Sequence, residues 1–261
     1  MSHHHPWPYA RVLAHRGGGA LAPENTLAAI EVGHRHGYRA IEFDAMLAAD
    51  AVPVLIHDPT LERTTNGTGD VSAHTAAELA RLDAGAWMAP RFAGARLPSL
   101  MEAIAFCRHN NIWINIEIKP APGHDSATGA QVARVTAQAY QDLVTAGGDR
   151  ADRVQPLAPL FSSFSREALG AARLAIPDLP RGLLVGPLPA DWEEQLESLA
   201  CVALHCSHKH LTRALARAVK DAGYWLFCYT VNETGRARKL FDWGVDAFCT
   251  DRIDVIPASF A

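Results

Sequence analysis

The sequence has no long apolar run and no excess of basic residues, and these two absences exclude broad classes of protein. No apolar stretch approaches the roughly 18–20 residues that a membrane-spanning helix needs, so we expect no membrane insertion. Lysine and arginine number 24 against 28 acidic residues, which gives a net charge of -4. A nucleic-acid binder more often carries a basic patch, and nucleic acid is therefore not an expected partner.

Paired cysteines and nucleotide-binding glycine motifs are also missing. The 5 cysteines form no CxxC pair and mostly lie in or beside apolar runs, which is typical of buried free thiols in a reducing compartment. The N-terminus has no apolar core of a signal peptide, so we expect a cytoplasmic protein, and we expect no metal site at His3 to His5. The segment GGGALAPEN matches neither GxGxxG nor a Walker loop, which disfavours a doubly wound sheet.

The sequence does contain a repeated alternation of β-rich and helical segments. The expected strands are 11–15, 40–47, 52–57, 113–119, 159–164, 181–186, 201–207, 224–231 and 246–250. The expected helices are 25–36, 99–110, 126–146, 165–176, 191–199, 212–222 and 233–243. This alternation predicts a parallel sheet with helices packed outside it.

The strand list is one longer than an eight-stranded barrel allows, and segment 40–57 resolves the count. Its two strands leave no room for a helix between them, and Asp50 and Ala51 lie where a hairpin would turn. Strand 52–57 is therefore an antiparallel excursion that brings His57 back beside Asp44. We predict a single-domain (β/α)8 TIM barrel over residues 1–261, of α/β class, with a small insertion over about 58–98 after the second barrel strand. A doubly wound open sheet is the alternative.

Two strands carry carboxylates on the face that should point into the barrel. In AIEFDAML, Glu42 and Asp44 alternate with apolar residues, and in NIEIK the residues Asn115, Glu117 and Lys119 do the same. Unpaired charge buried there would be very costly, whereas a divalent cation would hold the three carboxylates together. Oxygen ligands favour Mg²⁺ or Ca²⁺ over zinc.

Histidines and basic side chains lie at the ends of the same strands. His15 ends the first strand and His57 ends the excursion, and two imidazoles beside a metal site can act as general acid and general base near neutral pH. Arg16 and Lys119 add positive charge suited to phosphate oxygens. This combination indicates cleavage of an anionic phosphate ester. The alternative is a buried ionic network in which Arg16 and Lys119 only neutralise the carboxylates.

A series of short motifs resembles one known family. HRG with PENT, EFD, HD followed by LERTTNG, EIK, SSF, YTVN and CTD occur in this order from about residue 9 to 257, as in the glycerophosphodiester phosphodiesterases. WPYARVLAHRGGGALAPENTLAAI and CTDRIDVI are most similar to the bacterial cytosolic enzymes of glycerol-3-phosphate uptake. The resemblance implies a (β/α)8 barrel with a small insertion after the second strand, which agrees with the strand count.

The resemblance also implies roles for the candidate residues. Three carboxylates would be the ligands of one divalent cation, Mg²⁺ or Ca²⁺: Glu42, Asp44 and Glu117. The acid–base pair would be His15 and His57, and the phosphate-binding groups would be Arg16 and Lys119. In PENT, Glu24 and Asn25 would support the site from behind, while Asn25 or Thr26 would also cap the following helix. Tyr229 and Phe164 would line the pocket; the family often has tryptophan at the position of Tyr229, a difference that concerns the substrate rather than the chemistry.

We therefore predict metal-dependent hydrolysis of glycerophosphodiesters, such as glycerophosphocholine and glycerophosphoethanolamine, to sn-glycerol 3-phosphate and an alcohol. The nucleophile is either water or the neighbouring hydroxyl of the glycerol, through a cyclic phosphate. One alternative is a lipid phosphodiesterase or lyase on a related barrel, which the polar insertion disfavours. Another is a non-catalytic phosphate-ligand binder, which the retention of every candidate histidine and carboxylate disfavours. An apolar face on the outer helices would mark a homo-oligomer.

Overall fold

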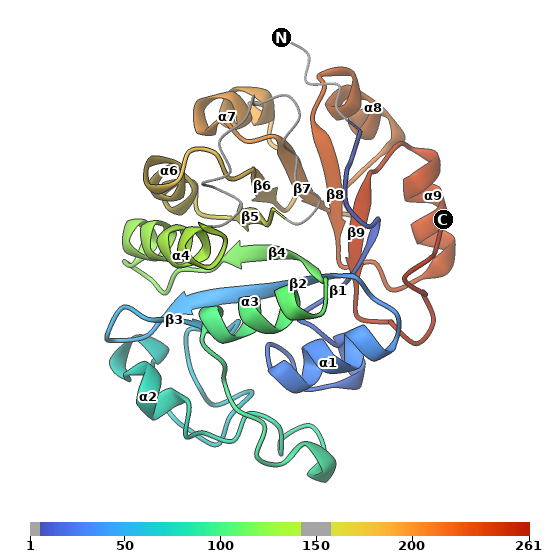
Figure 1. Cartoon of the computed structure of the whole chain (residues 1–261). Helices are drawn as coiled ribbons and strands as arrows, with labels where there is room; N and C mark the ends of the chain where they lie inside the picture. Colours follow the sequence, from blue (N-terminus) through green and yellow to red (C-terminus); the bar gives the residue numbers. More distant parts are fainter. Residues whose placement is uncertain (1–5, 142–157) are drawn as a thin grey trace.

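The computed structural model describes residues 6–141 and 158–261, and these residues form a closed barrel of parallel strands (Figure 1). The barrel strands are β1 (Val12–Ala14), β2 (Ala40–Leu47), β4 (Trp113–Ile118), β5 (Leu160–Ser163), β6 (Arg181–Val185), β7 (Ala203–Ser207), β8 (Trp225–Tyr229) and β9 (Ala247–Thr250). They pair in chain order, and the ring closes where β9 pairs with β1 and β1 with β2. The predicted (β/α)8 barrel is confirmed.

Helices cover the outside of this barrel between successive strands (Figure 1). They are α1 (Leu27–Arg35), α3 (Leu100–His109), α4 (Asp125–Ala139), α6 (Arg166–Ala175), α7 (Trp192–Leu199), α8 (Arg213–Asp221) and α9 (Thr234–Asp242). Thr26, Ser99 and Ser165 each accept a hydrogen bond from a first-turn backbone N–H, which explains where α1, α3 and α6 begin. The expectation of one helix over 126–146 is wrong at its end, because α4 ends at Ala139 with Tyr140 as its C-cap; residues 142–146 of that range lie outside the described residues, as do His3 to His5.

Strand β3 (Pro53–Leu55) is the predicted excursion. It pairs antiparallel with the end of β2, where Ala45 lies opposite Leu55, and Ala51 makes the turn with a φ of 58°. The backbone N–H of Ile56 donates to the carbonyl oxygen of Asp44 at 3.2 Å. His57 therefore directly follows the residue that pairs with Asp44, as the hairpin register predicts.

Residues 58–98 form the insertion between β3 and α3. The insertion contains the short elements η2 (Val71–Ala73), α2 (Ala76–Leu79) and η3 (Pro90–Phe92). Its apolar residues Leu61, Val71 and Leu79 pack in one cluster with Met46 and Val54 of the β2–β3 hairpin. The insertion is thereby fixed beside β2, β3 and α1, away from the later strands (Figure 1).

The pleat of β2 and β4 separates an apolar face from a polar one. Ile41, Phe43 and Ile116 are fully buried in the cluster that includes residues of the outer helices. The alternate side chains, such as Glu42 and Asn115, must then point into the barrel. At the opposite end the barrel is filled with aromatic rings instead, in a separate cluster that contains Tyr9, Trp113 and Trp225. The three buried carboxylates Glu42, Asp44 and Glu117 thus lie away from this aromatic cluster, toward the carboxyl end of the strands.

Two further expectations concern the whole described chain. Every cysteine is free and buried: Cys107, Cys201, Cys206, Cys228 and Cys249. Among residues 6–141 and 158–261, no helix combines the length and apolar character required to cross a membrane.

Candidate active site

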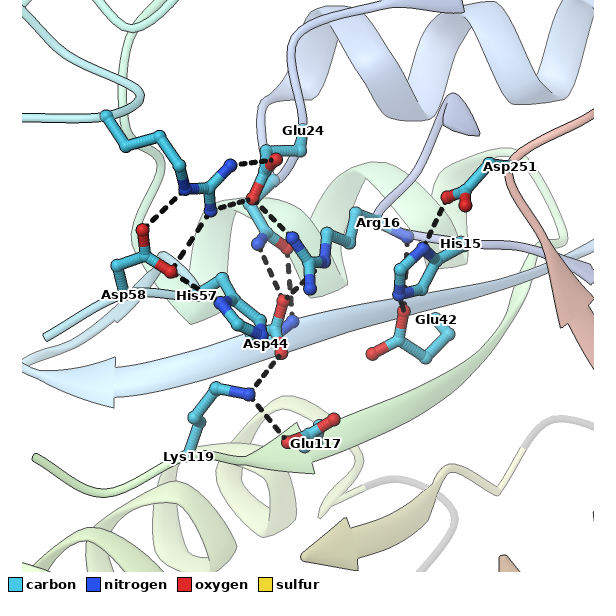
Figure 2. Close-up of polar contacts among 12 residues, drawn as sticks. His15, Arg16, Glu24, Glu42, Asp44, His57, Asp58, Glu117, Lys119 and Asp251 are labelled. Carbon is cyan, nitrogen blue, oxygen red and sulfur yellow. Dashed lines mark hydrogen bonds and ion pairs between the residues drawn. The ribbon is translucent and has the colours of Figure 1, made fainter. Parts of the chain in front are cut away.

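Three carboxylates meet at the carboxyl end of β2 and β4. The register of these two strands places Asp44 opposite Glu117 and Glu42 opposite Asn115. One oxygen from each of Glu42, Asp44 and Glu117 lies within 4.8 Å of the other two, so these residues could hold a metal ion (Figure 2). The sequence-predicted cation ligands therefore come together in space.

The three carboxyl groups differ in how readily they ionise. Burial, together with the negative charge of Asp44, raises the pKa of Glu42 to about 7 and that of Glu117 to about 8. Burial also opposes ionisation of Asp44, but the charges of Arg16 and Lys119 outweigh it and lower the pKa of that carboxyl. Full ionisation of the cluster therefore needs more positive charge than the side chains supply.

A nearby amide completes a donor set that suits a hard cation. The Oδ1 atom of Asn115 is buried and has no hydrogen-bond partner within the described part of the chain, while its Nδ2 donates to Ser162 Oγ at 3.0 Å. An unpaired buried amide oxygen is costly. Three carboxylates and this amide offer only oxygen ligands, which fit Mg²⁺ or Ca²⁺ better than a softer ion.

His15 lies between the carboxylate cluster and the loop after β9. Its Nδ1 is 2.6 Å from Asp251 Oδ1, and its Nε2 is 3.8 Å from Glu42 Oε2. Asp251 is itself held by Asn232, whose Nδ2 donates at 2.9 Å. Burial lowers the pKa of His15, but Asp251 and Glu42 more than offset this, so the pKa is raised overall. The ring therefore has a fixed orientation, with Nε2 directed toward the cluster.

His57 is held in the same manner from the other side of the site. Its Nδ1 lies 2.6 Å from Oδ1 of the next residue, Asp58, and Asp58 in turn accepts hydrogen bonds from Arg63 (Figure 2). Burial is the largest influence on His57 and lowers its pKa, although Asp44 acts in the opposite direction. Both histidines thus have a carboxylate on Nδ1, which leaves Nε2 available for proton transfer.

The two basic residues predicted at the site contact its carboxylates. Arg16 has a positive φ of 51°, its Nε is 3.3 Å from Asp44 Oδ2, and its backbone N–H donates to Glu42 Oε2 at 3.1 Å. Lys119 Nζ lies 3.1 Å from Glu117 Oε1 and 3.7 Å from Asp44 Oδ1. These ion pairs are also what the alternative interpretation of the sequence requires, in which Arg16 and Lys119 only neutralise the buried carboxylates. Both basic side chains also line a cavity, where a substrate anion can reach them.

Behind Asp44 lie Asn25 and Glu24 of PENT. Asn25 takes a positive φ of 59°, donates from Nδ2 to Asp44 Oδ2 at 2.8 Å and accepts from the backbone N–H of Asp44 at 3.1 Å. Because Asn25 is committed to Asp44, Thr26 alone caps α1. Glu24 bridges Arg16 and Arg63, at 2.7 Å from each.

The cavity above the carboxylates has a volume of about 160 Å³ and is lined by Phe227, His15, His57, both basic residues and the two aromatic rings expected there. These rings, Phe164 and Tyr229, pack edge to face with centroids 5.9 Å apart, and the Tyr229 hydroxyl donates to the Val185 carbonyl oxygen at 2.6 Å. His205 also borders the cavity, stacked on Phe227. His208 and His210, the other histidines of LHCSHKH, do not line it.

Sequence reasoning did not assign three of these residues: Asp58, Arg63 and Asp251. Asp58 and Asp251 end the motifs HD and CTD, and Arg63 belongs to LERTTNG. Asp58 and Asp251 directly follow expected strands, which was the available signal for these two. Arg63 follows no strand directly, and none of the three belongs to a periodic strand or helix face.

Comparison with known proteins identifies the fold family. Residues 15–255 match the model of the glycerophosphoryl diester phosphodiesterase family. The chain belongs to this family. The predicted enzyme class, a phosphodiesterase that cleaves glycerophosphodiesters, is confirmed as well.

Full-length relatives support the family assignment. The chain is 32% identical to YhdW of Bacillus subtilis (strain 168) over 250 residues, which cover 94% of this chain and 96% of YhdW. It is 31% identical to the glycerophosphodiester phosphodiesterase of Caldanaerobacter subterraneus subsp. tengcongensis, over 92% of this chain and 93% of that one. An Oleispira antarctica phosphodiesterase, solved in complex with its product sn-glycerol-3-phosphate, superposes with a TM-score of 0.84 and 36% identity over 94% of each chain.

Proposed function

We propose that this family member hydrolyses glycerophosphodiesters to sn-glycerol 3-phosphate and an alcohol, using one divalent cation, Mg²⁺ or Ca²⁺, and a histidine pair. The observation that supports this most is the set of three carboxylates within 4.8 Å of one another, with His15 and His57 on either side. The product in the Oleispira antarctica structure supports the glycerol 3-phosphate part of the proposal.

Phosphate binding is divided among several residues. Glu42, Asp44 and Glu117, with the amide oxygen of Asn115, would hold the cation. When bound, the cation neutralises charge on a non-bridging phosphate oxygen. Arg16 would share that role with Lys119, because each already lies at the edge of the cluster and faces the cavity. A substrate anion would compete with the buried carboxylates for Arg16 and Lys119, so the site would need the positive charge of the metal ion as well.

The histidines would carry the protons. One takes a proton from the nucleophile, and the other gives a proton to the oxygen of the leaving alcohol. Asp251 and Asp58 keep each Nδ1 bonded, so that each Nε2 alone exchanges protons with the reactants. The nucleophile is water or the neighbouring hydroxyl of the glycerol, through a cyclic phosphate.

The glycerol would lie against Phe164 and Tyr229. Because the Tyr229 hydroxyl is bonded to the Val185 carbonyl, this residue presents mainly its ring to the cavity. The large exposed apolar side chains nearest the site in the described chain are single rings, Phe164 and Trp87, which do not form a continuous apolar rim. This favours a small glycerophosphodiester over a membrane lipid.

The test is glycerol 3-phosphate release from glycerophosphocholine, measured with Mg²⁺, with Ca²⁺ and with EDTA. We expect release that needs a cation and that falls by at least 10²-fold in His15→Ala, since a general acid or base typically contributes about 10²–10⁴. Glu42→Ala and Glu117→Ala should lose activity and also the thermal stabilisation that added cation gives the parent. If both variants keep full EDTA-sensitive activity, the assigned cation site is wrong.

Three expectations from the sequence stay predictions: a cytoplasmic location, a homo-oligomer and a single domain over residues 1–261. Cell fractionation, light scattering and limited proteolysis, respectively, would check them.

A further inference from the structure

A second cavity adjoins the first, and two residues line both cavities. It has a volume of about 400 Å³ and, like the smaller cavity, is lined by His15 and Arg16. Its other walls come from different parts of the chain: the β1–α1 loop with Gly19, Ala20 and Ala22, and the insertion with Trp87 and Met88. A phosphodiester has two arms on one phosphorus. Two cavities that meet at His15 and Arg16, where the phosphate would bind, can receive one arm each.

The insertion wall is held in place by its own hydrogen bonds. Oδ1 of Asp83 accepts from the backbone N–H groups of Gly85 and Ala86, each at 2.8 Å, and Oδ2 accepts from that of Gly94 at 2.7 Å. The indole Nε1 of Trp87 donates to the Ala84 carbonyl oxygen at 2.9 Å. The loop therefore presents Trp87 in a fixed position, with 45% of this large apolar residue exposed.

Facing Trp87, residues Gly19, Ala20 and Ala22 carry only small side chains, and at Gly19 a larger one does not fit. Gly19 has a φ of +52°, and a Cβ atom added there would lie 2.3 Å from the Asp251 carbonyl oxygen. With Ala20 and Ala22 beside it, this wall leaves open the space that Trp87 and Met88 face. The volume easily accommodates a small alcohol.

The charged groups at this cavity indicate what kind of alcohol it prefers. Glu24 and Asp251 supply negative charge, but both already accept hydrogen bonds. The oxygens of Glu24 accept from Arg16 and Arg63. Those of Asp251 face His15 Nδ1 and Asn232 Nδ2.

A primary ammonium group donates hydrogen bonds, so it would have to compete with the side chains that already donate to the oxygens of Glu24 and Asp251. A methylated ammonium donates no hydrogen bond, so it can use the electrostatic attraction without displacing a partner. An aromatic face, which Trp87 offers, is also a surface on which such a group binds well.

We propose that the cavity between the β1–α1 loop and Trp87 binds the alcohol arm of the substrate and favours an alcohol with a quaternary ammonium group, of the choline type. The assignment rests on the proposed hydrolysis of glycerophosphodiesters at the adjoining site. Trp87 is then a specificity residue that contacts the leaving alcohol and takes no part in the chemical step.

The test compares kcat/KM of the parent and Trp87→Ala on three diesters of glycerol 3-phosphate. Their alcohols are choline, ethanolamine and 3,3-dimethylbutanol, the neutral carbon analogue of choline. Loss of the indole should lower kcat/KM for the choline ester by about three- to tenfold, with less than a twofold change for the ethanolamine ester. Trp87→Phe, which keeps an aromatic face, should restore most of the loss. Leu174→Ala, which alters another exposed apolar residue, is the matched control.

Product inhibition separates a subsite effect from a structural one. Glycerol 3-phosphate lacks the alcohol arm, so its inhibition constant should be the same in Trp87→Ala and the parent, and weaker in Tyr229→Ala. An unchanged kcat/KM for the choline ester in Trp87→Ala overturns the proposal. So does an equal loss on all three esters with weakened inhibition by glycerol 3-phosphate. A parent enzyme that cleaves none of the diesters refutes the proposed function instead.

Discussion

At the scale of single residues, the site is built from two matched histidine–carboxylate pairs. His15 and His57 each place Nδ1 at 2.6 Å from an aspartate, although one aspartate is adjacent in sequence and the other follows β9. The pairing fixes which ring nitrogen faces the reactants and stabilises the imidazolium when a proton is held. The two histidines differ in burial and in the charges around them, so the pKa of His15 is raised and that of His57 is lowered.

Asp251→Asn tests how far this pairing supports proton transfer. An amide can still accept from His15 but carries no charge, so we expect kcat to fall about 10- to 100-fold, less than the roughly 10²–10⁴ that a general acid or base contributes. KM for glycerophosphocholine should rise as well, because Asp251 supplies part of the negative charge that would attract the ammonium group of the alcohol. Steady-state kinetics on glycerophosphocholine across pH would measure both, and the limb of the pH profile that reports His15 should move to lower pH.

Asp254→Asn serves as the control, because that exposed carboxylate pairs with Arg252 and is not among the residues that line either cavity. An Asp251→Asn enzyme with parental kcat and pH profile would show that the carboxylate does not act through His15.

At the scale of elements, the periodic parts of the site were predictable and the aperiodic parts were not. Glu42, Asp44 and Glu117 alternate with apolar residues on strands, and the pleat alone places them inside the barrel. The hairpin register likewise placed His57 beside Asp44. Asp251 reaches His15 from a loop 236 positions away in sequence, and no repeat in the sequence encodes such a contact.

The same reason explains why the second cavity was not anticipated. Trp87 lies on an irregular loop whose position depends on Asp83 and its backbone partners, not on the period of a helix or strand. Most expected elements were found with ends differing by a few residues, and caps such as Thr26 and Ser99 mark the helix starts in the sequence. The exception is α4, which was expected to reach 146 and ends at Ala139.

The close packing of two loops gives an element-scale prediction. The β1–α1 loop approaches the loop after β9 so closely at Gly19 that an added Cβ would contact the Asp251 backbone. Gly19→Ala should therefore destabilise the protein by about 2–4 kcal/mol, from a positive φ that costs roughly 1 kcal/mol and overpacking of about 1–3 kcal/mol. Activity should also fall, because Asp251 shifts away from His15.

Gly123→Ala is a matched control, since Gly123 has a φ of +80° but no atom within 4 Å of the added Cβ. Urea unfolding and kcat of the two variants would separate backbone strain from the clash. Equal losses of stability in both would mean that the loops separate without cost.

At the scale of the whole molecule, one buried histidine links stability to pH. Burial lowers the pKa of His205 from 6.5 to about 3, so the folded protein keeps this ring neutral while the unfolded chain takes up a proton below about pH 6.5. Stability due to this group is therefore complete above pH 6.5 and is lost as pH falls toward 3, by up to about 1.4 kcal/mol per pH unit.

His205→Leu should reduce that dependence. The free energy of unfolding from urea titrations between pH 4 and 7 should fall less steeply with acid in the variant than in the parent. His109→Leu, which removes a histidine from an exposed position, should retain the parental slope. A parental slope in His205→Leu as well would show that protonation of this ring does not contribute to acid unfolding.

The barrel also distributes the two ends of the proposed substrate over separate stretches of chain. Trp87, which would contact the alcohol, lies in the insertion before α3, whereas Phe164 and Tyr229, which would contact the glycerol, follow β4 in the sequence. The side chains that would hold the cation and transfer protons all precede α4 in the sequence. Recombination that exchanged only β5 to β8 would thus alter the residues that contact the glycerol and leave Trp87, at the alcohol, unchanged. The specificities for the two ends of the substrate can therefore evolve independently.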